Sequence, residues 1–444
     1  MTMMWDTGQP KPAGRAAAPA DKGLVDLKVR IHQHLLDQLN LSVLCRTSRD
    51  TLRDEVRGLI APLLAEEKRL MTPSQTTQLI DDVLDELLGL GPLEPLLADD
   101  TIADILINTH KSVYVERMGR LELTDVQFQD SRHLIRIINK IVSAVGRRVD
   151  ESQPMVDARL ADGSRVNAII PPLAVDGPLV SIRKFARKPI DMDRLVTLDS
   201  VTSEMAEVLR GIVSAKRNIL ISGGTGSGKT TLLNALSAYI DNRERIVTIE
   251  DSAELQLQQP HVGRLETRPP SIEGSGEVTQ RDLVRNALRM RPDRVIVGEV
   301  RAGEAFDMLQ AMNTGHDGSM TTVHANTPRD ALSRIEQMIG MAGLELSPRS
   351  IRQQIASAIH VVIQAERLED GQRRVVSITE ITGMEEDVIS MQEIFRFRRQ
   401  GRSEDGRMTG QFETTGVRPK FVELLASRGI GMHSEIFAPG RVSI

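Results

Sequence analysis

Apolar residues recur at helical spacing through the first ninety residues of the chain. The apolar positions of segments 24–39, 52–64 and 79–88 each predict an amphipathic helix. The third helix opens with Thr72-Pro73-Ser74-Gln75, a capping-box sequence with proline at the first helical position, and Gly89 suits its end. We therefore expect a helical bundle over 24–95, preceded by a Pro-, Ala- and Gly-rich tail, 1–23, that is disordered.

From residue 99 the pattern changes to short apolar runs. Segments 105–107, 113–115, 166–170 and 179–182 predict strands, and 134–145 predicts a helix between them. We expect a small α+β N-terminal domain over 96–188, with a PAS-like arrangement. The polar residues 189–193 form the expected linker to the next domain.

Between residues 199 and 381 short strands alternate with helices, which is typical of parallel βαβ units. The predicted strands are 218–222, 246–249, 295–297, 320–323 and 361–364. Asp370-Gly371 predicts a hairpin turn after the last of these. The predicted fold class is α/β, with a parallel-sheet domain over 194–393 and a C-terminal hairpin and tail over 394–444.

One loop of this domain has the sequence of a phosphate-binding loop. The strand 218–222 is followed by GGTGSGKT and then by a helix, which matches G-x-x-x-x-G-K-[ST] in its expected setting. Glycines let successive backbone N–H groups point at phosphate oxygens. The residues expected to bind ATP are Gly223, Gly224, Thr225, Gly226, Ser227, Gly228, Lys229, Thr230 and Thr231, with Lys229 on the β- and γ-phosphates.

Acidic residues follow two other strands. Glu299 ends an apolar strand, and ligands of parallel sheets lie at the carboxyl ends of strands, so we expect Glu299 to polarise the attacking water. Glu250, followed by Asp251, ends another strand and can hold Mg²⁺ through waters. Thr230, Glu250 and Glu299 are thus the candidate Mg²⁺ ligands. His324 follows a third strand and can hydrogen-bond to the γ-phosphate, although a lone histidine is more often structural.

Composition limits the class of protein. The chain has 444 residues, 40% of them hydrophobic and 26% charged, which is typical of a globular protein. A single cysteine excludes an intramolecular disulfide, and no apolar stretch approaches the roughly 18 residues of a membrane span. The net charge of −5 gives no global basic field for nucleic acid. We expect a cytoplasmic protein that reaches a membrane only through partners.

Four sequence blocks resemble those of the secretion-superfamily ATPases. They are GGTGSGKTT, TIEDSAELQLQ, MRPDRVIVGEVR and GHDGSMTTVHAN, which look like the Walker A, Asp, Walker B and His boxes of that family. Outside the core, GLGPLEPLLADDTIADILIN, VYVERMGRLE, ADGSRVNAIIPPLA, IFRFRRQG and GQFETTGVRPKF resemble the CpaF/TadA-like branch, which assembles Tad/Flp pili.

This resemblance implies a RecA-like core and an ATP-hydrolysing motor that assembles or retracts a Tad/Flp type IV pilus. It implies a hexameric ring, with ATP near the N-terminal domain and the neighbouring subunit, and an inner-membrane platform protein as partner. Arg165 and Arg183 match the N-terminal-domain arginines that reach the phosphates in the family. Together with Lys229, Glu250, Glu299 and His324 they are the candidate catalytic residues.

Two other classes of function remain open at this point. The best support for a RecA-like nucleic-acid translocase is the cluster Arg396, Arg398, Arg399 and Arg402, with Phe395 and Phe397 beside it, which a solvated edge strand or a protein contact explains as well. An ATP-binding scaffold without turnover would keep Lys229 and Thr230, but Glu250 and Glu299 argue against it. Nucleic acid is therefore an unlikely partner.

Overall fold

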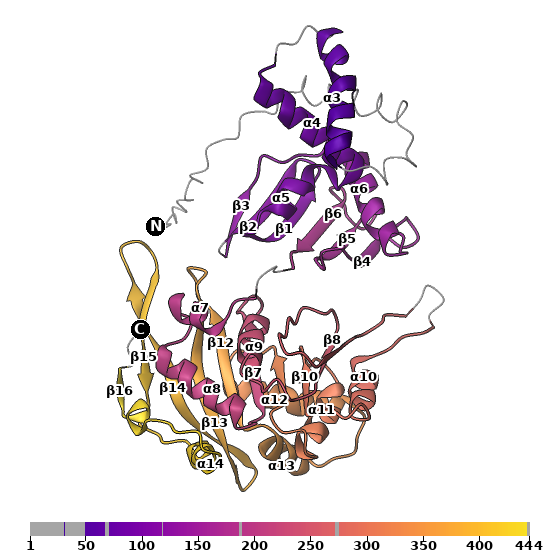
Figure 1. Cartoon of the computed structure of the whole chain (residues 1–444). Helices are drawn as coiled ribbons and strands as arrows, with labels where there is room; N and C mark the ends of the chain where they lie inside the picture. The colour runs from indigo at the N-terminus through magenta and orange to yellow at the C-terminus, as the bar shows by residue number, and fades with distance from the viewer. Residues whose placement is uncertain are drawn as a thin grey trace, which may run out of the picture. The chain divides into compact units, whose positions relative to one another are not determined.

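The computed structural model describes residues 31, 49–66, 71–117, 119–185, 189–270 and 275–441 (Figure 1). Two compact units divide the chain between residues 186 and 187, and each is described by itself. The expected tail 1–23 lies outside the described residues, as does the first expected helix except for Ile31.

The first unit begins with a pair of helices, α3 (Arg49–Glu66) and α4 (Pro73–Leu88). The capping box expected at the start of α4 is confirmed, because the Thr72 side chain accepts a hydrogen bond from the backbone N–H of Gln75 and Gln75 Oε1 accepts one from the backbone N–H of Thr72. Buried Leu, Ile and Val side chains join the two helices, and Ile31 belongs to the same cluster.

A six-stranded antiparallel sheet forms the rest of this unit. Its order is β3-β2-β1-β6-β5-β4, and the buried face of α6 (Ser131–Ala144) joins the same apolar cluster as its strands. The helix expected over 134–145 and the strands expected around it are therefore confirmed. The strands are β1 (Ile102–Thr109), β2 (Ser112–Arg117), β3 (Arg120–Leu123), β4 (Met155–Arg159), β5 (Arg165–Ile169) and β6 (Leu179–Arg183); η1 (Gly91–Leu93) and α5 (Glu94–Ala98) precede them.

The second unit is built on a ten-stranded sheet, ordered β16-β15-β14-β13-β12-β7-β11-β10-β8-β9. The strands from β12 to β9 are parallel, which confirms the expected βαβ units. They are β7 (Ile219–Gly223), β8 (Ile246–Glu250), β9 (Val262–Glu266), β10 (Arg294–Val297), β11 (Met320–Val323) and β12 (Val361–Arg367). Because these six strands run parallel, their carboxyl ends all lie along one edge of the sheet.

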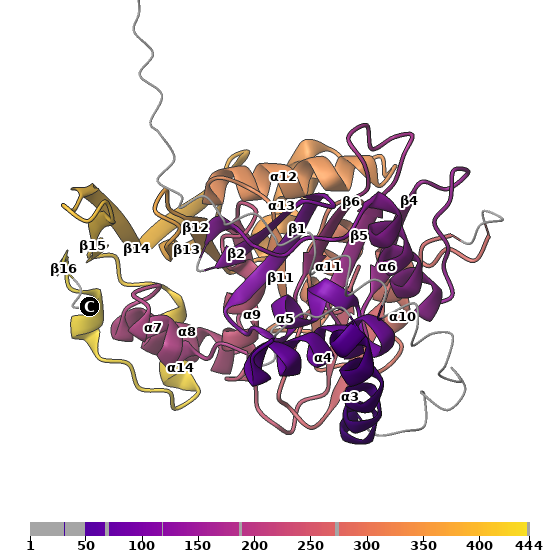
Figure 2. The same cartoon turned by 90° about the horizontal axis from the view of Figure 1, so that it is seen from above.

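Helices cover both faces of this sheet (Figure 2). Successive residues of β7 enter different cores, since Ile219 and Ile221 pack with α8 and α9 while Leu220 packs with α11 and α12. One layer contains α7 (Met192–Thr197), α8 (Ser203–Ser214), α9 (Lys229–Ser237) and α14 (Phe421–Ser427). The other contains α10 (Gln280–Ala287), α11 (Glu304–Asn313), α12 (Pro328–Met341) and α13 (Pro348–Ala358).

Antiparallel strands extend the sheet beyond β12. The hairpin expected at Asp370-Gly371 is confirmed, and two more hairpins turn between residues 385 and 388 and between residues 402 and 408. Strand β14 runs across residue 394, so the boundary expected there falls inside an element, and residues 192 and 193 of the expected linker already belong to α7. The added elements are β13 (Arg373–Glu385), β14 (Val388–Arg402), β15 (Met408–Thr414), η2 (Ser434–Phe437) and β16 (Gly440–Arg441).

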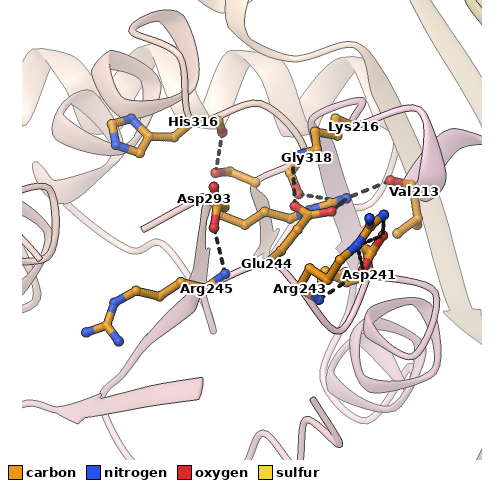
Figure 3. Close-up of polar contacts among 12 residues, drawn as sticks. Val213, Lys216, Asp241, Arg243, Glu244, Arg245, Asp293, His316 and Gly318 are labelled. Carbon is orange, nitrogen blue, oxygen red and sulfur yellow. Dashed lines mark hydrogen bonds and ion pairs between the residues drawn. The ribbon is translucent and has the colours of Figure 1, made fainter. Parts of the chain in front are cut away.

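A buried ion pair lies at the amino ends of the parallel strands β8 and β10 (Figure 3). Arg294, at the start of β10, is 1% exposed and donates two hydrogen bonds, of 2.8 and 3.0 Å, to the Glu244 carboxylate. It also donates to the carbonyl oxygens of Val213 and Gly318. Gly318 has φ +84°, and a Cβ at this position would lie 2.5 Å from Arg294 Nη1, so no larger residue fits. Lys216 adds a second cation to Glu244 at 3.1 Å.

Candidate functional site

The phosphate-binding loop lies between a fully buried strand and a helix. Strand β7 ends at Gly223, and α9 begins at Lys229 with Gly228 as its N-cap. Gly228 has φ +92°, a backbone conformation that glycine adopts at no steric cost. The loop therefore presents backbone N–H groups together with a helix N-terminus, and both attract a phosphate.

Lys229 is held inside this loop. Its Nζ donates hydrogen bonds of 3.0 Å to the carbonyl oxygens of Gly223 and Gly224, and it lies 3.9 Å from Glu299 Oε1. Burial lowers the pKa of Lys229, and the neighbouring Glu299 acts in the opposite direction. The ammonium group is thus placed where the phosphates of a bound nucleotide require positive charge.

Glu299 follows β10 with only Gly298 between them. One of its oxygens, Oε2, pairs with the Arg301 guanidinium at 2.6 Å. The other, Oε1, faces Lys229 and lies 3.6 Å from Nδ1 of His324. The carboxylate therefore points its second oxygen toward the phosphate-binding loop, where a water-polarising acid has to be.

His324 follows β11, the strand between the loop strand β7 and β10. Its Nε2 lies 3.2 Å from the Thr225 hydroxyl at the tip of the loop, while Nδ1 faces Glu299. The structure thus brings together Thr225, Lys229, Glu299 and His324 from three strand ends. A movement of the loop at Thr225 can therefore alter the position of Glu299 through the imidazole of His324.

Glu250 occupies a different environment. It ends β8, which β11 and β10 separate from β7, a lateral displacement of about 14 Å for three strand spacings. The side chain is 3% exposed, and Oε2 accepts hydrogen bonds from the backbone of Glu254 and Leu255. Burial raises the pKa of Glu250. These bonds fold the loop after β8, a role that the sequence did not indicate.

Oxygen atoms of the kind that Mg²⁺ takes lie in two places, at the end of β8 and in the phosphate-binding loop. The Oε1 atom of Glu250 and the hydroxyl of Ser227 are buried without a hydrogen-bond partner, and Thr230 is the second residue of the loop helix α9. Mg²⁺ keeps several waters and takes its other ligands from one or two protein oxygens and the phosphates. Within the described residues no group of three or more His, Cys, Asp or Glu could hold a metal ion by itself.

Arg165 and Arg183 lie opposite each other on β5 and β6 of the first unit. Arg159 on β4 is opposite Arg165, and Asp104 is opposite Arg183 and pairs with it at 3.1 Å. Opposite residues of antiparallel strands share one face, so three arginines form a row there. Arg159 was missed by the sequence analysis because strand register decides which arginines become neighbours.

Two further arginines near the loop were also missed. Arg373, on the hairpin between β12 and β13, donates a 2.8 Å hydrogen bond from Nε to the carbonyl oxygen of Gly226. Arg301 pairs with Glu299, and its position two residues after that acid was a signal available in the sequence. Arg373 is 147 residues from Gly226, so only the fold brings them together.

The arginine cluster of the C-terminal segment is neutralised within the chain. Arg396 and Arg398 pair with Glu413, Arg399 pairs with Glu366, and Arg402 pairs with Glu369. The alternative explanation of a solvated strand agrees with the structure, because β14 pairs with β13 only as far as Arg396, and beyond it Arg398, Arg399 and Arg402 are exposed on a stretch that pairs with β15 alone. The feature that favoured a nucleic-acid translocase is thus a set of ion pairs, two within the β14–β15 hairpin and two that connect it to the β12–β13 hairpin.

These features define a P-loop ATPase with a RecA-like core. Residues 86–404 match the family model described as "Type II/IV secretion system protein", and the chain belongs to this family. It is therefore an ATPase of the secretion and pilus superfamily. No helix among the described segments is long and apolar enough to cross a membrane.

Named relatives cover much of the chain. A putative conjugal transfer protein of Mycobacterium tuberculosis is 40% identical over 299 residues, 66% of this chain and 84% of the relative. The conjugal transfer protein TrbB of Rhizobium radiobacter is 35% identical over 65% of this chain and 86% of the relative. The solved VirB11 ATPase of the Brucella suis type IV secretion system is 29% identical, with 65% of this chain and 95% of that chain covered and a TM-score of 0.35.

Proposed function

We propose that this chain is the cytoplasmic, Mg²⁺-dependent motor ATPase of a Tad/Flp pilus machine. It works as a hexamer against an inner-membrane platform protein, and pilus assembly is its main task. The observation that carries the proposal is the convergence of Lys229, Glu299 and His324 at the phosphate-binding loop. An ATP-binding scaffold without turnover has no use for an acid in this place.

The proposed reaction is an in-line displacement. The oxygen of a water molecule forms a bond to the γ-phosphorus while the bond to the β,γ-bridging oxygen breaks, which yields ADP and inorganic phosphate. Glu299 Oε1 accepts the hydrogen bond of this water and orients it. Lys229 neutralises charge on the β- and γ-phosphate oxygens. Bound Mg²⁺ supplies further neutralisation of the same charge, with Thr230, Glu250 and Glu299 as candidate ligands.

Phosphate release is proposed to drive the motion. His324 contacts both Thr225 and Glu299, so its contacts change when the γ-phosphate leaves. Arg165 and Arg183, joined by Arg159 in the same row, are proposed to reach the phosphates from the N-terminal domain over 96–188. A ligand shifts a conformational equilibrium only through contacts that differ between the states, and these contacts are the candidates.

The pilus branch is proposed from the C-terminal blocks. IFRFRRQG and GQFETTGVRPKF resemble the CpaF/TadA-like proteins, and they correspond to β14, β15 and the segment that leads into α14. Several relatives are named instead for conjugal transfer, which makes transport of DNA-linked cargo the outcome that has to be tested against pilus assembly.

The cellular test replaces the gene in its native host by the Lys229→Ala variant. Loss of surface pili with unchanged DNA transfer would support the proposal. Loss of DNA transfer with intact pili would assign the chain to a conjugative machine instead. The wild-type gene, reintroduced on a plasmid, is the control that restores either phenotype.

The biochemical test measures ATP hydrolysis per subunit against protein concentration, with and without Mg²⁺. A specific activity that rises with concentration supports sites completed in an oligomer. A flat specific activity would contradict the ring mechanism, and turnover that survives chelation of Mg²⁺ would contradict the proposed cofactor.

A further inference from the structure

Arg301 divides the two oxygens of Glu299 between different partners. Its Nε and Nη2 both contact Oε2, at 2.7 and 2.6 Å. Oε1 is left to face Lys229 at 3.9 Å and His324 at 3.6 Å. The terminal torsion of a glutamate is broad, so a carboxylate held on one oxygen is oriented and a carboxylate without this contact rotates.

Arg301 is itself fixed at both ends. Its Nη1 lies 3.0 Å from Asp251 Oδ2 on the loop that follows β8. Its backbone N–H donates a 2.6 Å hydrogen bond to Glu304, a buried acid in the first turn of α11. The guanidinium is planar and presents several donors in fixed directions, so it can hold two carboxylates in a fixed orientation, whereas the ammonium of a lysine is a point charge without this fixed geometry.

The ion pair between Arg301 and Asp251 joins the segments that follow β10 and β8, each of which the sequence analysis treated as a separate source of functional acids. Asp251 belongs to the loop after β8, and Glu299 and Arg301 belong to the segment after β10, its neighbour in the sheet. Glu250 braces the first loop from inside through its bonds to Glu254 and Leu255. The position of Glu299 therefore depends on the loop after β8 through a single guanidinium group.

We propose that Arg301 is the positioning residue that orients Glu299 toward the attacking water, and that Asp251 holds Arg301 in place for this task. The inference rests on the proposed role of Glu299 in ATP hydrolysis. It explains why an acidic residue follows β8 directly after the buried Glu250: Asp251 acts through Arg301.

The alternative is an ordinary surface ion pair. The Arg301 side chain is 58% exposed, and exposed ion pairs contribute little to stability. The two explanations differ in what they predict. A surface ion pair changes neither turnover nor folding when it is removed, whereas a positioning residue changes turnover alone.

Arg285 offers a matched control. Its side chain is 56% exposed, and it pairs at 3.0 Å with Asp307 of α11, which is 12% exposed. Asp307 keeps a second arginine, Arg281, in the Arg285→Gln variant. Both substitutions thus remove one exposed guanidinium from a less exposed carboxylate.

The experiment measures steady-state ATP hydrolysis and thermal unfolding of the full chain carrying Arg301→Gln, Arg301→Lys, Asp251→Asn or Arg285→Gln. For Arg301→Gln we expect kcat to fall at least about 10-fold, with the KM for ATP and the melting temperature unchanged. Arg301→Lys fails to restore kcat, Asp251→Asn causes a smaller loss of kcat, and Arg285→Gln matches the wild type.

A double variant separates positioning from direct contact with the nucleotide. If Arg301 acts through Glu299, then Glu299→Gln/Arg301→Gln turns over no more slowly than Glu299→Gln alone. A further loss in the double variant would overturn the inference, as would a kcat for Arg301→Gln equal to that of Arg285→Gln. A marked drop in the melting temperature of Arg301→Gln would also overturn it, since the residue would then be structural. Wild-type protein without ATP hydrolysis would overturn the proposed function and the inference together.

Discussion

The two ends of the parallel sheet use the same pair of chemical groups for different purposes. At the amino ends, Arg294 and Glu244 form a bidentate ion pair whose arginine is 1% exposed. At the carboxyl ends, Arg301 and Glu299 form an ion pair whose arginine is 58% exposed. The first arginine also satisfies two carbonyl oxygens, whereas the second shares itself between two carboxylates.

This difference shows at which edge of the sheet ion pairs can exchange partners and at which edge they cannot. A buried charge that loses its partner is left desolvated, so the amino-end pair has essentially one arrangement. At the carboxyl ends, Glu299 remains partly in contact with water. Besides Arg301, both Lys229 and His324 lie within 4 Å of its carboxylate and can act as alternative partners. Glu299 can exchange these partners at small cost when a phosphate arrives or leaves. Rigidity at one edge and exchange at the other suit a sheet that binds nucleotide at one edge only.

The largest expected effect comes from breaking the amino-end pair. Arg294→Met leaves Glu244 buried with Lys216 as its remaining partner, and we expect the free energy of unfolding to fall by about 3–5 kcal/mol in urea titrations. The double variant Glu244→Gln/Arg294→Met should be less destabilised, because it leaves no buried carboxylate. A stability of Arg294→Met equal to the wild type would show that the two ends do not differ.

The corresponding change at the carboxyl end should spare stability. For Glu299→Gln we expect kcat for ATP hydrolysis to fall about 10²–10³-fold while nucleotide binding and the urea midpoint stay near the wild type. Glu413→Gln is the control with normal turnover. It removes a carboxylate of β15 that pairs with Arg396 and Arg398 of β14. Wild-type turnover in Glu299→Gln would direct attention to the strand that ends at Glu250.

His360 sharpens the comparison through pH. It lies just before β12 at the amino-end edge, where its Nδ1 accepts a hydrogen bond from the backbone of Asn218, and burial, with Arg217 nearby, lowers its pKa to about 4. Between pH 6.5 and 4 the unfolded chain binds a proton that the folded chain refuses. Stability is therefore complete above pH 6.5 and falls below it, by about 1.4 kcal/mol per pH unit at most. Urea midpoints measured from pH 7 to 4.5 should fall less steeply for His360→Asn.

The smallest effect is expected at the arginine cluster of β14. Arg399→Gln and Arg402→Gln each remove one exposed ion pair to the hairpin after β12, so stability should change by less than about 1 kcal/mol. Double-stranded DNA should not stimulate ATP hydrolysis at low salt in either variant or in the wild type. Stimulation that disappears in these variants would revive the nucleic-acid translocase.

Local signals in the sequence were sufficient for many of the elements, although they did not indicate β3, β4 or β9. The capping box at Thr72, the alternation of strands and helices, and the loop sequence all concern residues within a few positions of each other. The sequence also predicted that Lys229 and Glu299 lie close together, because both follow buried strands and the carboxyl ends of parallel strands lie at one edge of the sheet.

What the sequence could not supply depends on register and on long-range contacts. From the sequence, Glu250 and Glu299 were both candidate catalytic residues and Mg²⁺ ligands, since each ends a strand. The order of the sheet, however, places β8 three positions from the loop strand. The sequence also showed four basic residues on β14 without the acids that neutralise them, of which Glu413 lies on β15 and Glu366 and Glu369 lie on the hairpin of β12 and β13.

The sequence by itself determined that this chain binds nucleotide phosphates on a strand–loop–helix unit and carries acids after neighbouring strands. Only the tertiary structure decided that Arg301 takes one oxygen of Glu299, that Arg159 joins Arg165 and Arg183 in a row, and that Arg294 is buried. The reason is physical: a motif is fixed by local geometry, whereas the partner of a charge and its exposure to water depend on which distant segments the sheet places beside it.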